Sequence, residues 1–153
     1  MTLMPKHVAE MTIKALNNVS KVIKGSKVLI MGLTYKENVA DTRETPAKEL
    51  IKERREYGVE VYGCDPLLDN IEQEFGINYY DYRLLTNDSR LSANDSRLLT
   101  VDCIILTVAH DSFKIITLDE LKSVMNESPI LIDVRGIFDR KEIEENEFYY
   151  RTI

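Results

Sequence analysis

Apolar residues in the first part of the chain recur at intervals of three and four. Between residues 5 and 23 they are Val8, Met11, Ala15, Leu16, Val19, Val22 and Ile23. This spacing places them on one face of a helix. Pro5 suits the first helical turn, where a missing N–H costs nothing, and we expect Gly25 to end the helix. The pattern predicts an amphipathic helix whose apolar face needs a partner surface.

Three later stretches are almost continuously apolar. They comprise residues 27–32, 101–108 and 130–134. Runs of this length without alternation are typical of strands covered on both faces of a parallel sheet. Residues 59–62 and 148–153 are predicted as two further strands, the second at an edge of the sheet.

Helical patterns separate these strands. Thr45 and Pro46 provide a cap and a first-turn proline for a helix that Gly58 is expected to end. Its apolar stripe is Ala47, Leu50, Ile51 and Tyr57. A shorter helix follows the strand at 101–108, and its packing residues are Leu118, Leu121 and Met125.

The alternation of strands and helices defines the fold class. Residues 67–82 are less regular, with a short helix ending near Phe75 and Gly76 and a small strand at 77–80. Strand, helix and strand in this order form right-handed parallel units. The sequence therefore predicts an α/β fold, a Rossmann-like doubly wound and mainly parallel sheet preceded by an amphipathic helix.

An internal repeat with a period of seven occupies residues 79–99 and closes at Thr100. Its copies read YDYRLLT, NDSRLSA and NDSRLLT, so that Leu84, Leu91 and Leu98 would share one helical face. Asn, Asp and Ser, however, prefer caps and turns to helix interiors. We interpret the repeat as a broken helix or a surface insertion, and the lack of an e/g charge pattern disfavours a coiled coil.

Composition and charge narrow the function. The 153 residues include 20 Lys and Arg against 26 Asp and Glu, a net charge of −6. That balance argues against a nucleic-acid binder, and no apolar run reaches the length of a membrane span. The first ten residues lack the apolar segment of a secretory signal. We expect one cytoplasmic domain of ordinary size.

Few residues could bind a metal or form a disulfide. The chain has two cysteines, Cys64 and Cys103, and two histidines far apart in the sequence. Two cysteines are too few for a disulfide scaffold and make no CxxC pair, and this set gives no zinc motif. We predict that both cysteines are buried packing residues.

Ligands of an open parallel sheet bind beyond the carboxyl ends of its strands. The groups expected there are Leu33 to Lys36, Asp41 to Arg43, Asp65, His110 with Asp111, and Asp133 to Gly136. Lys36, Arg43 and Arg135 would then converge on one rim. Three cations at one rim suit phosphate groups, through charge-assisted and bidentate hydrogen bonds.

Each of these groups has a simpler interpretation. A loop lysine or arginine is commonly a solvated surface charge. Asp65 could hold a ribose hydroxyl or could be a turn residue before Pro66. His110 and Asp111 look like a catalytic pair, but adjacent residues rarely face each other, and a loop cap is favoured.

The loop after the first strand lacks the usual nucleotide fingerprints. Residues 32–36 read GLTYK, with one glycine. Neither GxGxxG nor GxxxxGK[ST] is present. The sequence thus predicts a Rossmann-type sheet that does not hold a dinucleotide in the usual way.

At residues 32–46, GLTYKENVADTRETP, the chain resembles a known family. The stretch is similar to the G-L-[TA]-[FY]-K-x-x-x-x-D-x-R-x-[ST]-P signature of the UDP-glucose/GDP-mannose dehydrogenases. Further matches, in order, are MPKHV, YGVEV with the following DP, VD before a strand ending near HDSF, and IDVRG. MPxxV followed by KENVxDTR is most similar to the UDP-N-acetylglucosamine/mannosamine branch.

The resemblance implies an activity for the whole family member. It is an NAD-dependent, two-step oxidation of the C6 alcohol of a UDP-N-acetylhexosamine to a carboxylate, as in polysaccharide biosynthesis. The family's NAD domain and catalytic cysteine precede the part that this chain resembles, so no catalytic residue is expected here. Residues 1–24 would be the end of the central linking and dimerisation helix, and residues 25–153 the UDP-binding domain. The full-length protein would be a homo-oligomer.

The resemblance also implies roles for four residues. Lys36 would contact the UDP phosphates, Tyr35 the bound nucleotide sugar and Arg135 the UDP moiety. Arg43 would reach the NAD side of the cleft between domains. We expect the chain alone to lack dehydrogenase activity.

Three alternatives stay open. The chain could be a non-catalytic nucleotide-binding module that acts with a partner chain. It could be a dimerisation module that uses the apolar stripe of its first helix. It could also be an unrelated flavodoxin-like module that uses Asp41 or Asp65 and binds a flavin or a metal ion.

Overall fold

The sheet is the centre of the fold. The computed structural model describes residues 3–86 and 100–152, and over these residues the strands run in the order β3-β2-β1-β4-β5-β6 with every pairing parallel. The strands are β1 (Lys27–Met31), β2 (Glu60–Cys64), β3 (Asn78–Tyr79), β4 (Val101–Leu106), β5 (Met125–Asp133) and β6 (Tyr149–Thr152). The predicted fold class is confirmed, and β6 lies at an edge as expected.

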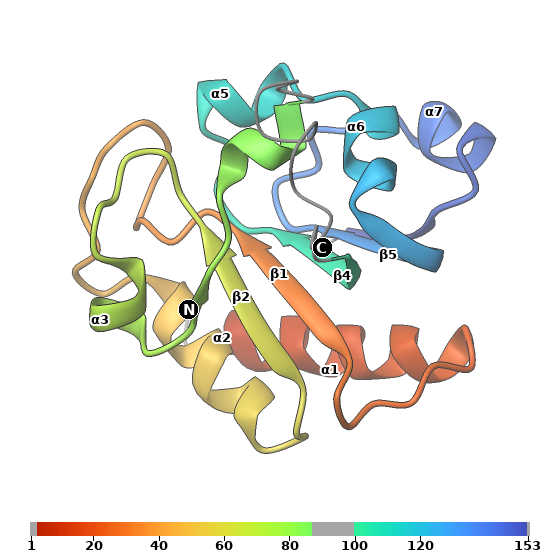
Figure 1. The fold of residues 1–153 in the computed structure, drawn as a ribbon, viewed down its shortest axis with the longest axis horizontal. Coiled ribbons are helices and arrows are strands. Elements are labelled where there is room, and N and C mark those ends of the chain that lie inside the picture. The colour runs from red at the N-terminus through yellow and green to blue at the C-terminus, as the bar shows by residue number, and fades with distance from the viewer. Residues whose placement is uncertain (1–2, 87–99, 153) are drawn as a thin grey trace.

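Helices cover both faces of the sheet (Figure 1). The first face carries α1 (Leu3–Asn18), α2 (Pro46–Arg55) and α3 (Ile71–Phe75). The opposite face carries the 3₁₀ helix η1 (Tyr82–Thr86), α5 (Asp111–Lys114), α6 (Leu118–Ser123) and α7 (Arg140–Glu145). Coverage on both sides explains why the central strands are continuously apolar.

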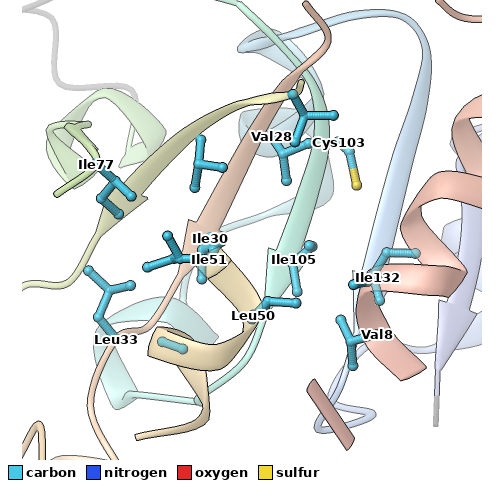
Figure 2. Close-up of a cluster of buried hydrophobic side chains, with 14 of the residues drawn as sticks. Val8, Val28, Ile30, Leu33, Leu50, Ile51, Ile77, Cys103, Ile105 and Ile132 are labelled. Carbon is cyan, nitrogen blue, oxygen red and sulfur yellow. The ribbon is translucent and has the colours of Figure 1, made fainter. Parts of the chain in front are cut away.

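Successive strand residues face opposite cores. Figure 2 shows Val28, Ile30 and Ile105 on the face that Leu50 and Ile51 of α2 cover. Their chain neighbours Leu29 and Ile104 belong to the other core. The two-residue period of a strand thus divides one apolar run between two helical layers.

The apolar face of α1 is covered by the chain itself. Val8, Ala15 and Leu16 are buried in the first core, together with residues of α2, β4 and β5. The outward positions of α1, such as Glu10 and Asn17, are polar and exposed. The predicted need for a partner surface is therefore met within this domain, and the division at residue 24 stays a prediction.

The expected end of the first helix was wrong. The helix ends at Asn18, and Ser20 takes a positive φ of 62°. The N–H groups of Ser20 and Lys21 donate to the carbonyls of Asn17 and Leu16, which closes the last turn before Gly25 is reached. Val22, assigned to the apolar stripe, is 78% exposed.

Two packing residues were assigned to the wrong elements. Tyr57 follows the end of α2 and is exposed, because the helix stops at Arg55. Met125 does not extend α6 but begins β5, which starts five residues before the predicted strand. A shift in register between Val101 and Cys103 lets this early part of β5 pair with β4.

Part of the heptad repeat lies outside the described residues. The three copies run from Tyr80 to Thr100, one residue later than the predicted bounds, and the first copy contains η1, in which Leu85 is buried against the second core. Leu84 is partly buried, whereas Leu91 and Leu98 fall within 87–99 and are not described. The shared helical face of these leucines stays a prediction.

A carboxylate ties the elements together at the opposite end of the sheet from the candidate site. Asp102 of β4 accepts hydrogen bonds from the backbone N–H of Lys27 and from Asn126 Nδ2, both at 2.9 Å, and pairs with Lys21 Nζ at 3.3 Å. Burial tends to raise the pKa of Asp102, but these hydrogen bonds and the nearby Lys21 lower it below its usual 3.8.

Candidate functional site

Three loops meet at the carboxyl ends of β1, β2 and β4. β1 lies between β2 and β4, so the loop of residues 33–38 is flanked by Asp65 after β2 and His110 after β4. Asp65 Oδ2 accepts from the backbone N–H of Leu33 at 2.8 Å and lies 2.9 Å from His110 Nε2. The backbone N–H of Asn38 donates to His110 Nδ1 at 2.9 Å. A buried pair of side chains thus supports the loop at both ends.

A second pair connects this loop to the end of β5. Arg135 Nε lies 2.9 Å from Glu37 Oε1 and donates to the carbonyl of Thr107 at 3.1 Å. Burial tends to raise the pKa of Glu37. The backbone amides of Glu37 and Ala109 donate hydrogen bonds to the carboxylate, and Arg135 places a positive charge beside it. Together these effects outweigh the effect of burial and lower the pKa of Glu37 below 4.5. Glu37 is therefore an ionised anchor for the Arg135 guanidinium.

Tyr35 and Arg135 line one small hollow at this rim. Its other walls come from the N-terminal halves of α1 and α2, the cap of α2 and the residues that follow β1, β4 and β5: Pro5, Val8, Thr34, Thr45, Pro46, Ala47, Leu50, Thr107, Val108 and Val134. Thr45 caps α2, accepting from the N–H of Ala47, and donates to the carbonyl of Thr34 at 3.1 Å. The hollow is thus mainly apolar, and its volume of about 20 Å³ is far below that of a typical ligand pocket, roughly 300–1,000 Å³. Tyr35 and Arg135, which line it, are both exposed.

Arg43 lies at a different hollow. Tyr35, Asp41, Arg43 and Glu44 line it together. Arg43 Nε is 3.1 Å from Asp41 Oδ1, and its side chain is 89% exposed. Hydrogen bonds from the Arg43 side chain and backbone lower the pKa of Asp41. Tyr35 is common to both hollows, whereas Arg43 and Arg135 do not share one.

Lys36 lines neither hollow. It follows Tyr35 on the loop and is exposed. The structure therefore places Tyr35 with Arg135 at one hollow, Tyr35 with Arg43 at the other, and Lys36 at neither. The roles of these four residues stay predictions.

Two alternatives from the sequence can be decided. Both carboxylate oxygens of Asp65 are occupied by protein groups, because Oδ1 accepts from the N–H of Leu67 at 2.9 Å. Asp65 is thus a turn and support residue, and the ribose interpretation was wrong. His110 precedes α5 but makes no side-chain cap, and its partner is Asp65 rather than the adjacent Asp111.

The pairs Asp65–His110 and Glu37–Arg135 were missed from the sequence. A signal for the first pair exists, since Asp65 directly follows β2 and His110 comes four residues after β4, and these two strands flank β1. For Glu37 no sequence signal exists, because its contact depends on how the loop of residues 33–38 folds back.

The cysteines lie in the core as predicted. Cys64 and Cys103 are fully buried and unpaired. Burial raises the pKa of the Cys103 thiol to about 12 and that of Cys64 well above its usual value. Thiols in this environment are packing residues rather than nucleophiles.

Residues 3–86 and 100–152 contain neither a cluster of metal ligands nor a membrane-spanning helix. No three His, Cys, Asp or Glu side chains there gather closely enough to hold a metal ion. In the same part of the chain, no helix combines the length and apolar character needed to span a bilayer.

The fold defines a Rossmann-like, doubly wound class of α/β domain, and comparison with known proteins identifies the family. The model of the UDP-glucose/GDP-mannose dehydrogenase family, UDP binding domain, matches residues 29–140. That match covers most of the chain, so the chain belongs to this family.

Curated relatives agree with this assignment. UDP-N-acetyl-D-mannosamine dehydrogenase of Methanococcus maripaludis (strain C7) is 33% identical over 149 residues, which are 97% of this chain and 30% of that protein. UDP-glucose 6-dehydrogenase of Rhizobium meliloti is 29% identical over 131 residues, 86% of this chain and 28% of that protein. The chain thus spans less than a third of the length of these relatives.

Solved structures share the fold. NDP-N-acetyl-D-galactosaminuronic acid dehydrogenase from Methanosarcina mazei Go1 superposes with a TM-score of 0.80 at 24% identity, covering 99% of this chain and 29% of that one. UDP-D-ManNAc dehydrogenase from Pyrococcus horikoshii superposes with a TM-score of 0.67 at 21% sequence identity, covering 98% of this chain and 30% of that one. The similarity includes α1 as well as the sheet.

Proposed function

We propose that this chain binds the UDP portion of a UDP-N-acetylhexosamine as part of an NAD-dependent 6-dehydrogenase. The observation that carries the proposal is the oriented Arg135 beside Tyr35 on one exposed rim; the hollow of about 20 Å³ beneath them is too small for a nucleotide, which would lie along the rim. Glu37 and the Thr107 carbonyl both hold Arg135 through Nε, and this orientation leaves its terminal nitrogens for an anion. Tyr35, Lys36 and Arg135 are the proposed substrate-binding residues.

NAD does not fit the usual dinucleotide position on this sheet. The first loop has one glycine, and Asp65, which stands where a ribose-binding acid would, is occupied by the protein. The cofactor would therefore be held mainly by the parts of the relatives that this chain does not match. Arg43, which is exposed and lines the second hollow, is the residue we propose to face it.

The catalytic cysteine is also assigned outside this chain. Cys64 and Cys103 are inaccessible, so neither suits nucleophilic attack on a sugar aldehyde. The purified chain should not reduce NAD in the presence of UDP-N-acetylmannosamine, and reduction at a rate above the protein-free control would contradict this. We place the whole enzyme in the cytoplasm as a homo-oligomer.

Calorimetric titration of UDP tests the proposed site. Arg135→Ala and Lys36→Ala should each raise the Kd at least about tenfold, since each removes a charge-assisted contact. Lys141→Ala, an exposed lysine on α7, is the matched control and should leave the Kd unchanged. Equal affinity in all variants would contradict the assignment.

The alternative of a dimerisation module stays a prediction. Val8, Ala15 and Leu16 of the first helix are buried in this chain's own core, whereas Met11, Ile13 and Val19 are only partly buried. The alternative of a non-catalytic module that acts with a partner chain shares its nucleotide binding with the proposal made above.

A further inference from the structure

A buried histidine and aspartate lie beneath the proposed substrate loop without reaching its outer surface. The side chains of Asp65 and His110 are 0% and 1% exposed. Neither residue lines the hollow of Tyr35 and Arg135. Polar groups buried this deeply are costly unless every hydrogen bond is made, so their contacts indicate what they do.

Their contacts converge on the backbone of one loop. Asp65 holds the N–H of Leu33, where the loop leaves β1, and His110 holds the N–H of Asn38, where the loop turns back. Tyr35, Lys36 and Glu37 lie between these two points.

The hydrogen-bond directions fix the form of the imidazole. Because the N–H of Asn38 can only donate, His110 Nδ1 accepts and carries no proton. The ring proton is therefore on Nε2, which donates to Asp65 Oδ2 at 2.9 Å. Thr34 Oγ1 lies 3.2 Å from the same nitrogen. Each ring nitrogen has a separate task, one toward the aspartate and one toward the loop.

We infer that Asp65 and His110 are positioning residues, which hold residues 33–38 in the conformation that presents Tyr35 and Lys36 to the substrate and Glu37 to Arg135. This inference rests on the proposed function. It assigns to the pair no contact with substrate. It predicts that the order of the loop depends more on the hydrogen-bond acceptor at the position of His110 Nδ1 than on the volume of the side chain.

Two substitutions separate the two ring nitrogens. His110→Asn places an acceptor oxygen near the position of Nδ1 and keeps a partner for Asn38. His110→Gln places its amide near the position of Nε2, so it keeps a donor to Asp65 and loses the partner of Asn38. Packing alone predicts the opposite order, because asparagine leaves the larger cavity. Asp111→Asn, at the exposed neighbour, is the matched control.

The main measurement is ¹⁵N relaxation of the free chain. In wild type and His110→Asn, residues 34–38 should have order parameters near those of rigid backbone, about 0.85, whereas in His110→Gln they should fall toward about 0.6. Equal values in both variants, or lower values in His110→Asn, would overturn the inference. In wild type, the Leu33 and Asn38 amides should be protected to a similar degree, and rapid exchange at Asn38 alone would overturn it as well.

The Kd for UDP is measured for the same variants. His110→Gln should raise the Kd about tenfold, the effect of one lost hydrogen bond, and His110→Asn by less than about threefold. If wild type itself shows no UDP binding, the proposed function fails for this chain. The relaxation data then still decide whether the pair positions the loop.

Discussion

Arg54 offers a sharp test of the packing between α1 and α2. Its side chain is fully buried, and its Nη2 donates to Thr12 Oγ1 at 2.7 Å. Nε and Nη1 have no partner among residues 3–86 and 100–152. Burial lowers the pKa of Arg54 from 12.5 to about 10. The protein thus holds a charged group where it is poorly compensated.

The magnitude follows from that pKa. A shift from 12.5 to about 10 corresponds to a cost of about 3 kcal/mol, at about 1.4 kcal/mol per unit. Arg54→Met removes this cost, keeps most of the apolar volume, and loses one hydrogen bond worth about 1 kcal/mol. Thr12 keeps a partner, because its hydroxyl donates to the carbonyl of Val8. The variant should be about 2 kcal/mol more stable.

Urea unfolding at pH 7 measures the difference. Lys52→Met, at an exposed position of the same helix, is the control and should change stability by less than about 0.5 kcal/mol. The folded pKa of Arg54 is depressed, so its cost is fully present below pH 10 and is relieved above it. The advantage of the variant should therefore shrink above pH 10. A loss of more than about 1 kcal/mol in Arg54→Met at pH 7 would refute the reasoning.

Three further predictions concern the rim and the opposite end of the sheet. Glu37→Ala should weaken UDP binding about tenfold, because Arg135 loses its anchor. Glu37→Gln keeps a hydrogen-bond acceptor for Arg135 and should change the Kd less than about threefold. A larger loss in Glu37→Gln than in Glu37→Ala would contradict the anchoring role. Gly32→Ala should cost at least about 2 kcal/mol in urea unfolding, because its φ is +102° and a Cβ would lie 2.9 Å from Val108 Cβ; a loss below about 1 kcal/mol would contradict this. Asp102→Asn should lower the free energy of unfolding by about 1–2 kcal/mol at pH 7. Because the pKa of Asp102 is lowered in the folded protein, the stability that its carboxylate contributes is present above pH 3.8 and is lost below it. The difference in stability between variant and wild type should therefore narrow as the pH falls from 5 to 3, and a constant difference would argue against this contribution.

The sheet could be predicted because its signal is local. Three continuous apolar runs and the intervening helical periodicity are sufficient to give parallel strands with helices on both faces. Element ends were harder. The first helix closes through backbone hydrogen bonds at Asn17 and Leu16, and the residue with positive φ is Ser20 rather than a glycine. Nothing in the residue types marks that end.

The candidate site was only partly predictable, for a different reason. Topology places Arg135 and the loop after β1 at one edge, and the sequence therefore identified the rim. It did not identify which cations share a hollow, because that depends on partners far apart in the chain, such as Glu37 for Arg135. The buried Asp65 and His110 were interpreted singly, although their shared partner is the loop between their strands.

The central claim is that this domain carries a uridine-nucleotide site at the carboxyl edge of its sheet. Titration of UDP into the ¹⁵N-labelled chain, followed through amide chemical shifts, tests it most directly. The account predicts shifts confined to residues 33–38, 45–47, 107–110 and 134–136, the loops and the first turn of α2 around the hollow. Shifts that cluster elsewhere, or none at millimolar UDP, would contradict it.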